Sequence, residues 1–171
     1  WYEEAARLGD AHASFVVGVK LFEGESPEGM TPEGRQRGLE LIERAAALGF
    51  PHACGHLGTR LARKAAGCDE LVEELAFPLL RLGAVRGDSD AAWTLARLLE
   101  EMGGRERLRE AAYWHLVAAR KDCRSARALG LAYGHGRGVE RSDEAGAAWL
   151  ARAAEEGSPE AAAQLAGFFL H

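Results

Sequence analysis

The feature that most constrains this chain is a helix–turn–helix pattern of small and large apolar residues that recurs along it. Its fullest copy spans residues 129–157 and consists of Leu129, Gly130, Tyr133, Gly136, Gly138, Val139, Trp149, Ala153, Ala154 and Gly157. The apolar residues fall at helical spacing on both sides of a glycine turn, and the last glycine tolerates the positive φ of a helix end. One such hairpin cannot bury both of its faces, so the pattern predicts stacked copies.

Two landmarks alternate through the whole chain. The first-helix landmark is a small residue among larger apolar ones, and it is centred on Gly18, Gly58, Ala96, Gly130 and Ala166. The second-helix landmark is a large apolar residue with two small residues four and five positions later, and it begins at Trp1, Leu41, Leu79, Trp114 and Trp149. Copies recur every 34–40 residues, as in helical-hairpin solenoids. Because large residues fill the space around each close helix contact, we expect Trp114 and Trp149 to be buried.

The residues of the fullest copy resemble the Sel1-like repeat family, a relative of the tetratricopeptide repeats. Ser142 departs from the family pattern, which usually has an acidic residue there. The resemblance implies an all-α, right-handed α/α superhelical solenoid of antiparallel helix hairpins, with about four complete repeats plus half-repeats at the ends. A tetratricopeptide solenoid is the alternative, but its period of about 34 residues is stricter. We expect one domain over 1–171, with a second helix at 1–9, repeats at 10–49, 50–87, 88–122 and 123–157, and a first helix at 158–171.

Prolines and short polar residues mark where helices should begin or break. Pro78 lies inside the second helix of repeat 50–87, where it removes a backbone hydrogen bond, so we expect a kink at Glu74–Pro78. The last helix is expected over Pro159–Leu170. The side chains expected to cap helix starts are Asp10, Thr31, Ser142 and Ser158.

The composition argues against several classes of function. A net charge of −5 gives no cationic footprint for nucleic acid. No apolar run reaches about 18 residues, so we expect no membrane insertion by this segment. An odd number of cysteines favours a reducing compartment such as the cytoplasm. Because Trp1 falls inside a second helix, we expect a longer parent protein, and a periplasmic location stays open. The excess of arginine over lysine indicates a bacterial source.

The residues that first suggest a metal or catalytic site do not complete one. His52 and His56 share a helix face, but two histidines make half of a zinc site, and Cys54 points into the small-residue packing slot. The loop Gly134–Gly138 resembles a phosphate-binding loop, yet it follows a helix and not a strand. No serine is followed by lysine three residues later, as in the nucleophile pair of β-lactam-recognising enzymes. We therefore predict no metal, no cofactor and no catalytic residue.

The remaining chemistry lies on one side of the first helices, next to their packing stripe. Several aromatic and arginine residues there are not required by the core pattern, and such residues are typical interface hot spots. We expect a groove for an extended or helical peptide, with Phe15, Phe22 and Trp93 as apolar anchors. We name the following predicted binding residues the first-helix face: Phe15, Val19, Phe22, His52, Trp93, Arg97, Arg124, Arg127 and Leu131.

The resemblance implies a scaffold or adaptor that binds a protein or peptide on this face, which lines the concave surface of the family's superhelix. Arg97, Arg124 and Arg127 would then pair with acidic groups of the partner. A simpler interpretation is that the residues of the face pack only against neighbouring repeats. Two other functions stay open: an enzyme acting on cell-wall or β-lactam-like compounds, and a regulatory repeat segment of a larger multidomain protein.

Overall fold

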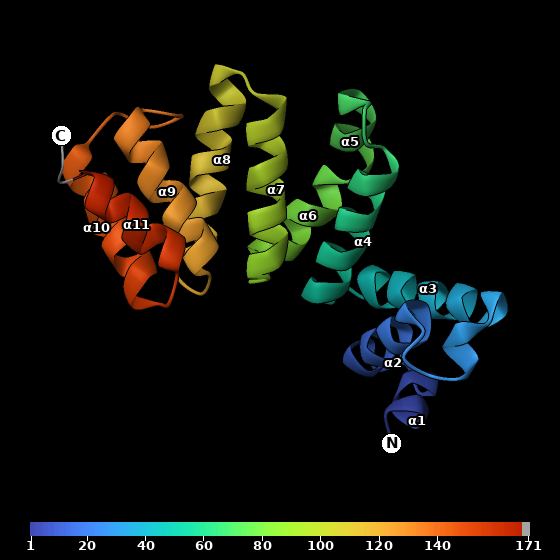
Figure 1. Cartoon of the computed structure of the whole chain (residues 1–171). Coiled ribbons are helices and arrows are strands. Elements are labelled where there is room, and N and C mark those ends of the chain that lie inside the picture. Colours follow the sequence, from blue (N-terminus) through green and yellow to red (C-terminus); the bar gives the residue numbers. More distant parts are fainter. Residues whose placement is uncertain (169–171) are drawn as a thin grey trace. The chain divides into compact units, whose positions relative to one another are not determined.

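The computed structural model describes residues 1–168, and within that range the regular elements are helices without a strand (Figure 1). The prediction of an all-α protein is confirmed. The helices form two compact units, Trp1–Gly87 and Asp88–His171, each with a hydrophobic core of its own. None of the described helices is both long and apolar enough to span a bilayer.

The first unit stacks its helices in chain order. Each of the first four α-helices packs on the next, and α4 then packs on α6. Buried residues of α3 and α4 form its core, which contains Ile42, Ala45, Ala46, Ala53 and Cys54. Its elements are α1 (Tyr2–Arg7), α2 (Ala11–Glu23), the 3-10 helix η1 (Glu28–Met30), α3 (Pro32–Ala47), α4 (Pro51–Lys64), α5 (Asp69–Leu75) and α6 (Phe77–Val85).

The second unit consists of two helical hairpins and one further helix. In Figure 1, α7 and α8 run as an antiparallel pair, and α9 pairs with α10 in the same way. The additional helix, α11, packs on α10. The core contains Ala119, Ala126, Leu150, Ala153 and Ala161. The elements are α7 (Ser89–Met102), α8 (Arg105–Ala118), α9 (Cys123–His135), α10 (Asp143–Glu155) and α11 (Pro159–Phe168).

Glycines explain why the two helices of a hairpin approach so closely. A Cβ atom added to Gly130 would lie 2.8 Å from Cγ of Leu150 and 3.0 Å from the carbonyl oxygen of Gly146, too close for a side chain. Such close packing requires a residue without a Cβ atom. The same pairing of a first-helix glycine with a buried second-helix residue occurs three times, as Gly18 with Ile42, Gly58 with Leu80 and Gly130 with Leu150.

The expected burial of Trp149 is wrong. Trp149 is half-exposed, and the next residue, Leu150, is fully buried in its place. One residue step turns a side chain by about 100° around the helix, so the landmark residue and its neighbour share the edge of the buried stripe. Trp114, at the equivalent landmark position, is buried as expected, and its indole N–H donates to Glu110 at 3.1 Å.

The kink expected at Glu74–Pro78 takes the form of a break between two helices. The structure ends α5 at Leu75 and begins α6 at Phe77, so Pro78 stands in the first turn of a new helix. A proline is tolerated there because the amide hydrogen it lacks would have no helical partner. Phe77 and Leu80 are buried on either side of it, so the break occurs while the chain stays packed on α4.

Polar side chains cap the helix starts where the sequence indicates. Asp88 and Asp122 cap α7 and α9, in addition to the four predicted residues. The last helix, predicted to reach Leu170, ends at Phe168 in the described chain, and the final predicted residues lie outside it. The confirmed caps accept backbone N–H groups as follows: Asp10 from Ala13 at 2.6 Å, Thr31 from Gly34 at 3.0 Å, Ser142 from Ala145 at 3.1 Å and Ser158 from Ala161 at 3.3 Å.

Candidate functional site

In the second unit, the first-helix face lies on α7 and α9, and contacts between these helices bring its residues together. The guanidinium carbon of Arg124 on α9 lies 4.5 Å from the ring centroid of Trp93 on α7. The same atom of Arg97 lies 5.6 Å from that centroid. Trp93 is half-buried, so its ring forms part of the surface together with the cations that stack on it.

Both of these arginines already have acidic partners within the chain. Arg124 donates to Asp90 at 2.6 Å and to Asp122 at 2.8 Å. The hydrogen bond to Asp122, and then that to Asp90, raise the pKa of Arg124. Arg97 forms an ion pair with Glu101, one turn further along α7. A carboxylate of a binding partner would therefore have to compete with these internal carboxylates for either guanidinium.

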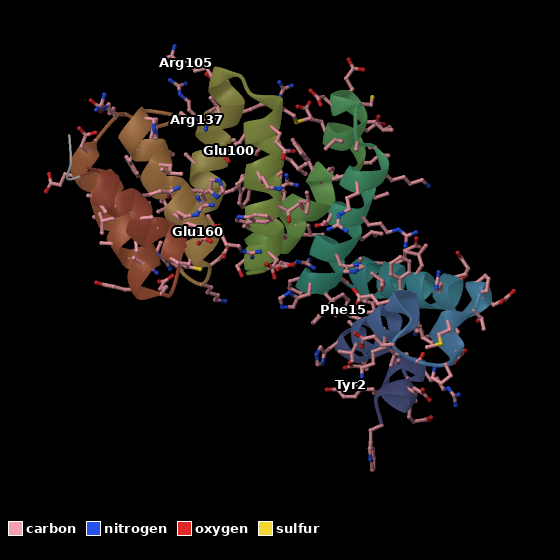
Figure 2. All side chains as sticks on the ribbon, viewed as in Figure 1. Tyr2, Phe15, Glu100, Arg105, Arg137 and Glu160 are labelled. Carbon is pink, nitrogen blue, oxygen red and sulfur yellow. The ribbon has the colours of Figure 1, made fainter. Side chains whose placement is uncertain are left out.

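A pocket of about 150 Å³ opens on the same pair of helices. Four of its residues come from α9 and one from α7, and one comes from the turn that follows α9. Two of them, Arg127 and Leu131, belong to the first-helix face. We name this site the α7–α9 pocket, and its lining residues are Glu100, Arg127, Ala128, Leu131, Ala132 and Arg137. Figure 2 labels Glu100 and Arg137, the two charged members that the first-helix face does not include.

Glu100 is in contact with a buried histidine of α8. The Nε2 atom of His115 lies 3.5 Å from Oε2 of Glu100, which is long for a hydrogen bond, and both ring nitrogens are unsatisfied. Burial of Glu100 acts to raise its pKa, but the His115 ring and the charge of Arg137 outweigh burial and lower the pKa. The wall of the pocket therefore carries an ionised carboxylate at neutral pH.

Arg127 and Arg137 differ from the arginines beside Trp93. Neither forms an ion pair with another residue in the range 1–168. Arg127 lowers the pKa of the Glu160 carboxyl on α11, although less than the hydrogen bonds from the Glu160 backbone and from Ser158 do. Arg137, in the turn after α9, helps to lower the pKa of Glu100 through its positive charge. The pocket lining thus includes two arginines that no carboxylate within residues 1–168 binds directly.

In the first unit, the first-helix face is part of an aromatic cluster. Phe15, Val19 and Phe22 of α2 are half-buried and pack against the core of that unit. The Phe15 ring centroid lies 5.4 Å from that of Phe50 and 6.4 Å from that of His52. Figure 2 labels Phe15 on α2. Part of the surface of these side chains is therefore buried against α4. The exposed His52 lies beside them on the surface.

A second contact in this cluster joins Phe22 to α4. The rings of Phe22 and His56 are nearly perpendicular, with their centroids 6.2 Å apart, and the guanidinium carbon of Arg60 lies 4.4 Å from the Phe22 centroid. Burial is the main cause that lowers the pKa of His56, and Arg60 and Arg63 act in the same direction, against the opposing charge of Glu23. His56 is therefore uncharged at neutral pH.

The residues that suggested a metal site have other surroundings. Cys54 is fully buried, as expected for the packing slot, with Sγ 3.6 Å from the carbonyl oxygen of Ala46. His52 stacks on the Phe15 ring, and His56 makes T-shaped contacts with the rings of Phe15 and Phe22. Over residues 1–168, no group of three or more histidine, cysteine or acidic side chains converges in a way that suits a metal ion.

Sequence reasoning missed Arg137 and His115. Arg137 stood inside a loop interpreted only as a repeat turn. His115 follows the landmark Trp114, at the position where the other hairpins have Ile42, Leu80 and Leu150. A histidine aligned with three aliphatic core residues was the available signal.

Comparison with solved structures identifies repeat proteins with the same architecture. One is a protective antigen present in uropathogenic Escherichia coli strains that displays an SLR fold; it is 26% identical, with a TM-score of 0.79, and the match covers 96% of this chain and 34% of that chain. Another is a Sel1 repeat protein from Oxalobacter formigenes, 25% identical with a TM-score of 0.77, where the match covers 94% of this chain and 64% of that chain. This chain therefore spans less than two thirds of either relative. No curated protein matches it.

The family comparison agrees with the structural one. The family model for the Sel1 repeat matches residues 1–10, 11–50, 89–123 and 124–158. These ranges cover more than half of the chain, and they include both hairpins of the second unit. The hairpin α4–α6, whose second helix is broken at Pro78, is outside them. The chain is an all-α solenoid that belongs to the Sel1 repeat family.

Proposed function

We propose that this protein is an interaction scaffold that binds a peptide or protein segment on its first-helix face, and that it is not an enzyme. The observation that carries the proposal is the surface of α7 and α9, where half-buried Trp93 is stacked with Arg97 and Arg124. Aromatic and arginine side chains dominate binding energy at protein interfaces. The internal ion pairs of both arginines hold their guanidinium planes in place, which lowers the entropy cost of binding.

The first unit offers a surface of different chemistry. It consists of phenylalanine and imidazole rings, with Phe15 and Phe22 half-buried and His52 exposed. Their partial burial against α4 supports a smaller contribution to binding than that of Trp93, because less of each ring is available to a partner. The proposal therefore places the principal apolar anchor on α7.

Selection of binding peptides from a random phage-displayed library tests the proposal. The full chain is the target, and the affinity of each selected peptide is measured by fluorescence polarisation. Replacing Trp93 by alanine should weaken binding at least about tenfold, because a central aromatic anchor is lost. Leu116→Ala is the control, since Leu116 is exposed on α8, the second helix of the same hairpin. Selected peptides that bind Trp93→Ala normally and Leu116→Ala weakly would show that the binding surface is on the second helices instead.

A further inference from the structure

We propose that the α7–α9 pocket binds the C-terminal residue of a peptide ligand. In this assignment Arg127 and Arg137 bind the terminal carboxylate, and Glu100 accepts a hydrogen bond from the N–H group on the same α-carbon. The inference rests on the proposed function, because it names the part of a peptide that this portion of α9 would recognise.

The charge of the pocket favours a singly charged anion. Arg127 and Arg137 supply two positive charges, and Glu100 supplies one negative charge on the same lining. Guanidinium groups match the planar geometry of a carboxylate and can bind it through parallel hydrogen bonds. A phosphate with two negative charges would be repelled by Glu100 at close range in a partly buried site. A singly charged carboxylate neutralises the excess charge and is repelled by Glu100 less strongly than such a phosphate.

Glu100 also offers acceptor positions to the ligand. Its carboxylate is ionised, and its contact with the buried His115 ring is too long to be a strong hydrogen bond. An ionised carboxylate has several acceptor positions that need N–H or O–H donors. The terminal amide N–H of a peptide lies one carbon atom away from the terminal carboxylate, so one residue can serve both the arginines and Glu100. The side-chain carboxylate of an internal aspartate or glutamate lacks a donor at that position.

The arginines of the pocket are available for this role. Arg97 and Arg124 are engaged with Glu101, Asp90 and Asp122, whereas Arg127 and Arg137 form no ion pair within residues 1–168. Arg127 has an electrostatic interaction with Glu160 of α11, without an ion pair. Glu160 is exposed and accepts a hydrogen bond from Ser158.

The size and apolar lining of the pocket favour a small terminal residue. A cavity of about 150 Å³ holds a molecule the size of benzene. Part of that space is taken by the carboxylate itself. The side chain of the terminal residue would then contact Ala128, Leu131 and Ala132. We therefore expect alanine or a residue of similar size to be preferred.

Titration of the ¹⁵N-labelled chain of residues 1–171 with small probes tests the assignment. N-acetyl-L-alanine carries both the terminal carboxylate and the adjacent amide, and should produce saturable NMR shifts of the Arg127 and Arg137 Nε–H signals. N-acetyl-L-alaninamide, which lacks the charge, should bind at least about tenfold more weakly, since it loses charge-assisted hydrogen bonds. Arg127→Ala and Arg137→Ala should abolish saturation, while Arg120→Ala, outside the pocket on the loop after α8, should not change it.

Three further probes separate the possible sources of a carboxylate. Free L-alanine tests recognition of an amino acid, N-acetyl-L-aspartic acid α-amide tests an internal acidic side chain, and inorganic phosphate tests a general anion. Tighter binding of any of these than of N-acetyl-L-alanine would overturn the assignment. Equal response to N-acetyl-L-alanine and its amide, or no saturable response to either, would overturn it as well. If selected peptides still depend on Trp93 in that case, the proposed function stands without this pocket.

Discussion

His115 differs most from the residues that occupy its position in the other hairpins. Ile42, Leu80 and Leu150 are aliphatic and fully buried there. His115 is equally buried, yet both of its ring nitrogens lack a hydrogen-bond partner. Unsatisfied buried polar atoms reduce stability. The contact with Glu100 is the polar interaction that the ring makes in the described chain.

Replacing His115 by leucine should raise the free energy of unfolding by about 1 kcal/mol at pH 7, because leucine fills a similar volume and removes two unsatisfied nitrogens. Urea unfolding followed by circular dichroism measures the change. His135→Leu, at an exposed position on α9, is the control and should have little effect. A loss of stability in His115→Leu would contradict the prediction and would show that the contact with Glu100 is net stabilising.

Glu100 gives the folded protein a specific pH dependence. Its pKa is lowered by the His115 ring and by Arg137, against the effect of burial. The ionised group therefore contributes stability that is present above its unfolded pKa of about 4.3 and is lost as the pH falls through the lower folded value. Glu100→Gln should destabilise the protein at pH 7, and the difference from wild type should shrink in acid. Urea unfolding at several pH values measures this, and a difference that stays constant with pH would contradict it.

Gly130 is required by close helix packing and not by its backbone conformation. Gly130→Ala should cost about 1–3 kcal/mol, because the added Cβ atom would press on Leu150 and on the backbone of α10. Gly167→Ala in α11 is the matched control, since no described atom lies within 4 Å of its added Cβ. That change should leave thermal stability unchanged or slightly higher. Equal effects of the two substitutions would contradict the packing explanation.

At the scale of elements, the start of α9 is stabilised by several contacts of its capping residue, Asp122. Asp122 accepts from the backbone N–H of Arg124 at 3.1 Å and from the Ser125 hydroxyl at 2.9 Å, besides its ion pair with Arg124. Asp122→Ala should lower the free energy of unfolding by about 1–2 kcal/mol. Asp122→Asn keeps a capping oxygen and should cost less. Thermal unfolding of both variants checks this order, and an asparagine variant as unstable as the alanine variant would contradict the capping role.

Much of the helical pattern could be predicted from the sequence, because local chemistry determines it. Thr31 and Ser142 cap helices where their spacing to the apolar stripe indicates, and Pro78 breaks a helix for reasons within its own turn. The choice between Trp149 and Leu150 as the buried residue could not be predicted. The two positions differ by about 100° around the helix, and the close approach of Gly130 decides between them.

Only part of the candidate site could be predicted from the sequence. Placing Trp93 on the outward side of α7 needs only the helical period. The partners of Arg124 depend on how α7 and α9 are aligned side by side, which no local pattern specifies. No local pattern specifies either that Glu100 of α7 and Arg137 of the turn after α9 line the same pocket. Which residues of the first-helix face bind a partner stays a prediction.

At the scale of the whole molecule, the two units present first-helix surfaces of different character. The first has a cluster of aromatic and histidine rings, with Phe15 in contact with Phe50 and His52. The second combines the arginine-stacked Trp93 with a charged pocket. Repeat proteins commonly use an extended surface made from equivalent elements of successive repeats. The two surfaces therefore differ in the chemistry that each offers to a ligand.

Hydrogen–deuterium exchange of the full chain, with and without a selected peptide at saturating concentration, tests binding on the first-helix face most directly. Ordering by a bound ligand should slow amide exchange in α7 and α9, with a smaller effect in α2 and α4. Exchange in α8 and α10 should change little. Protection centred on α8 and α10, where Leu116 and Trp149 are available, would contradict the proposed location of the binding surface.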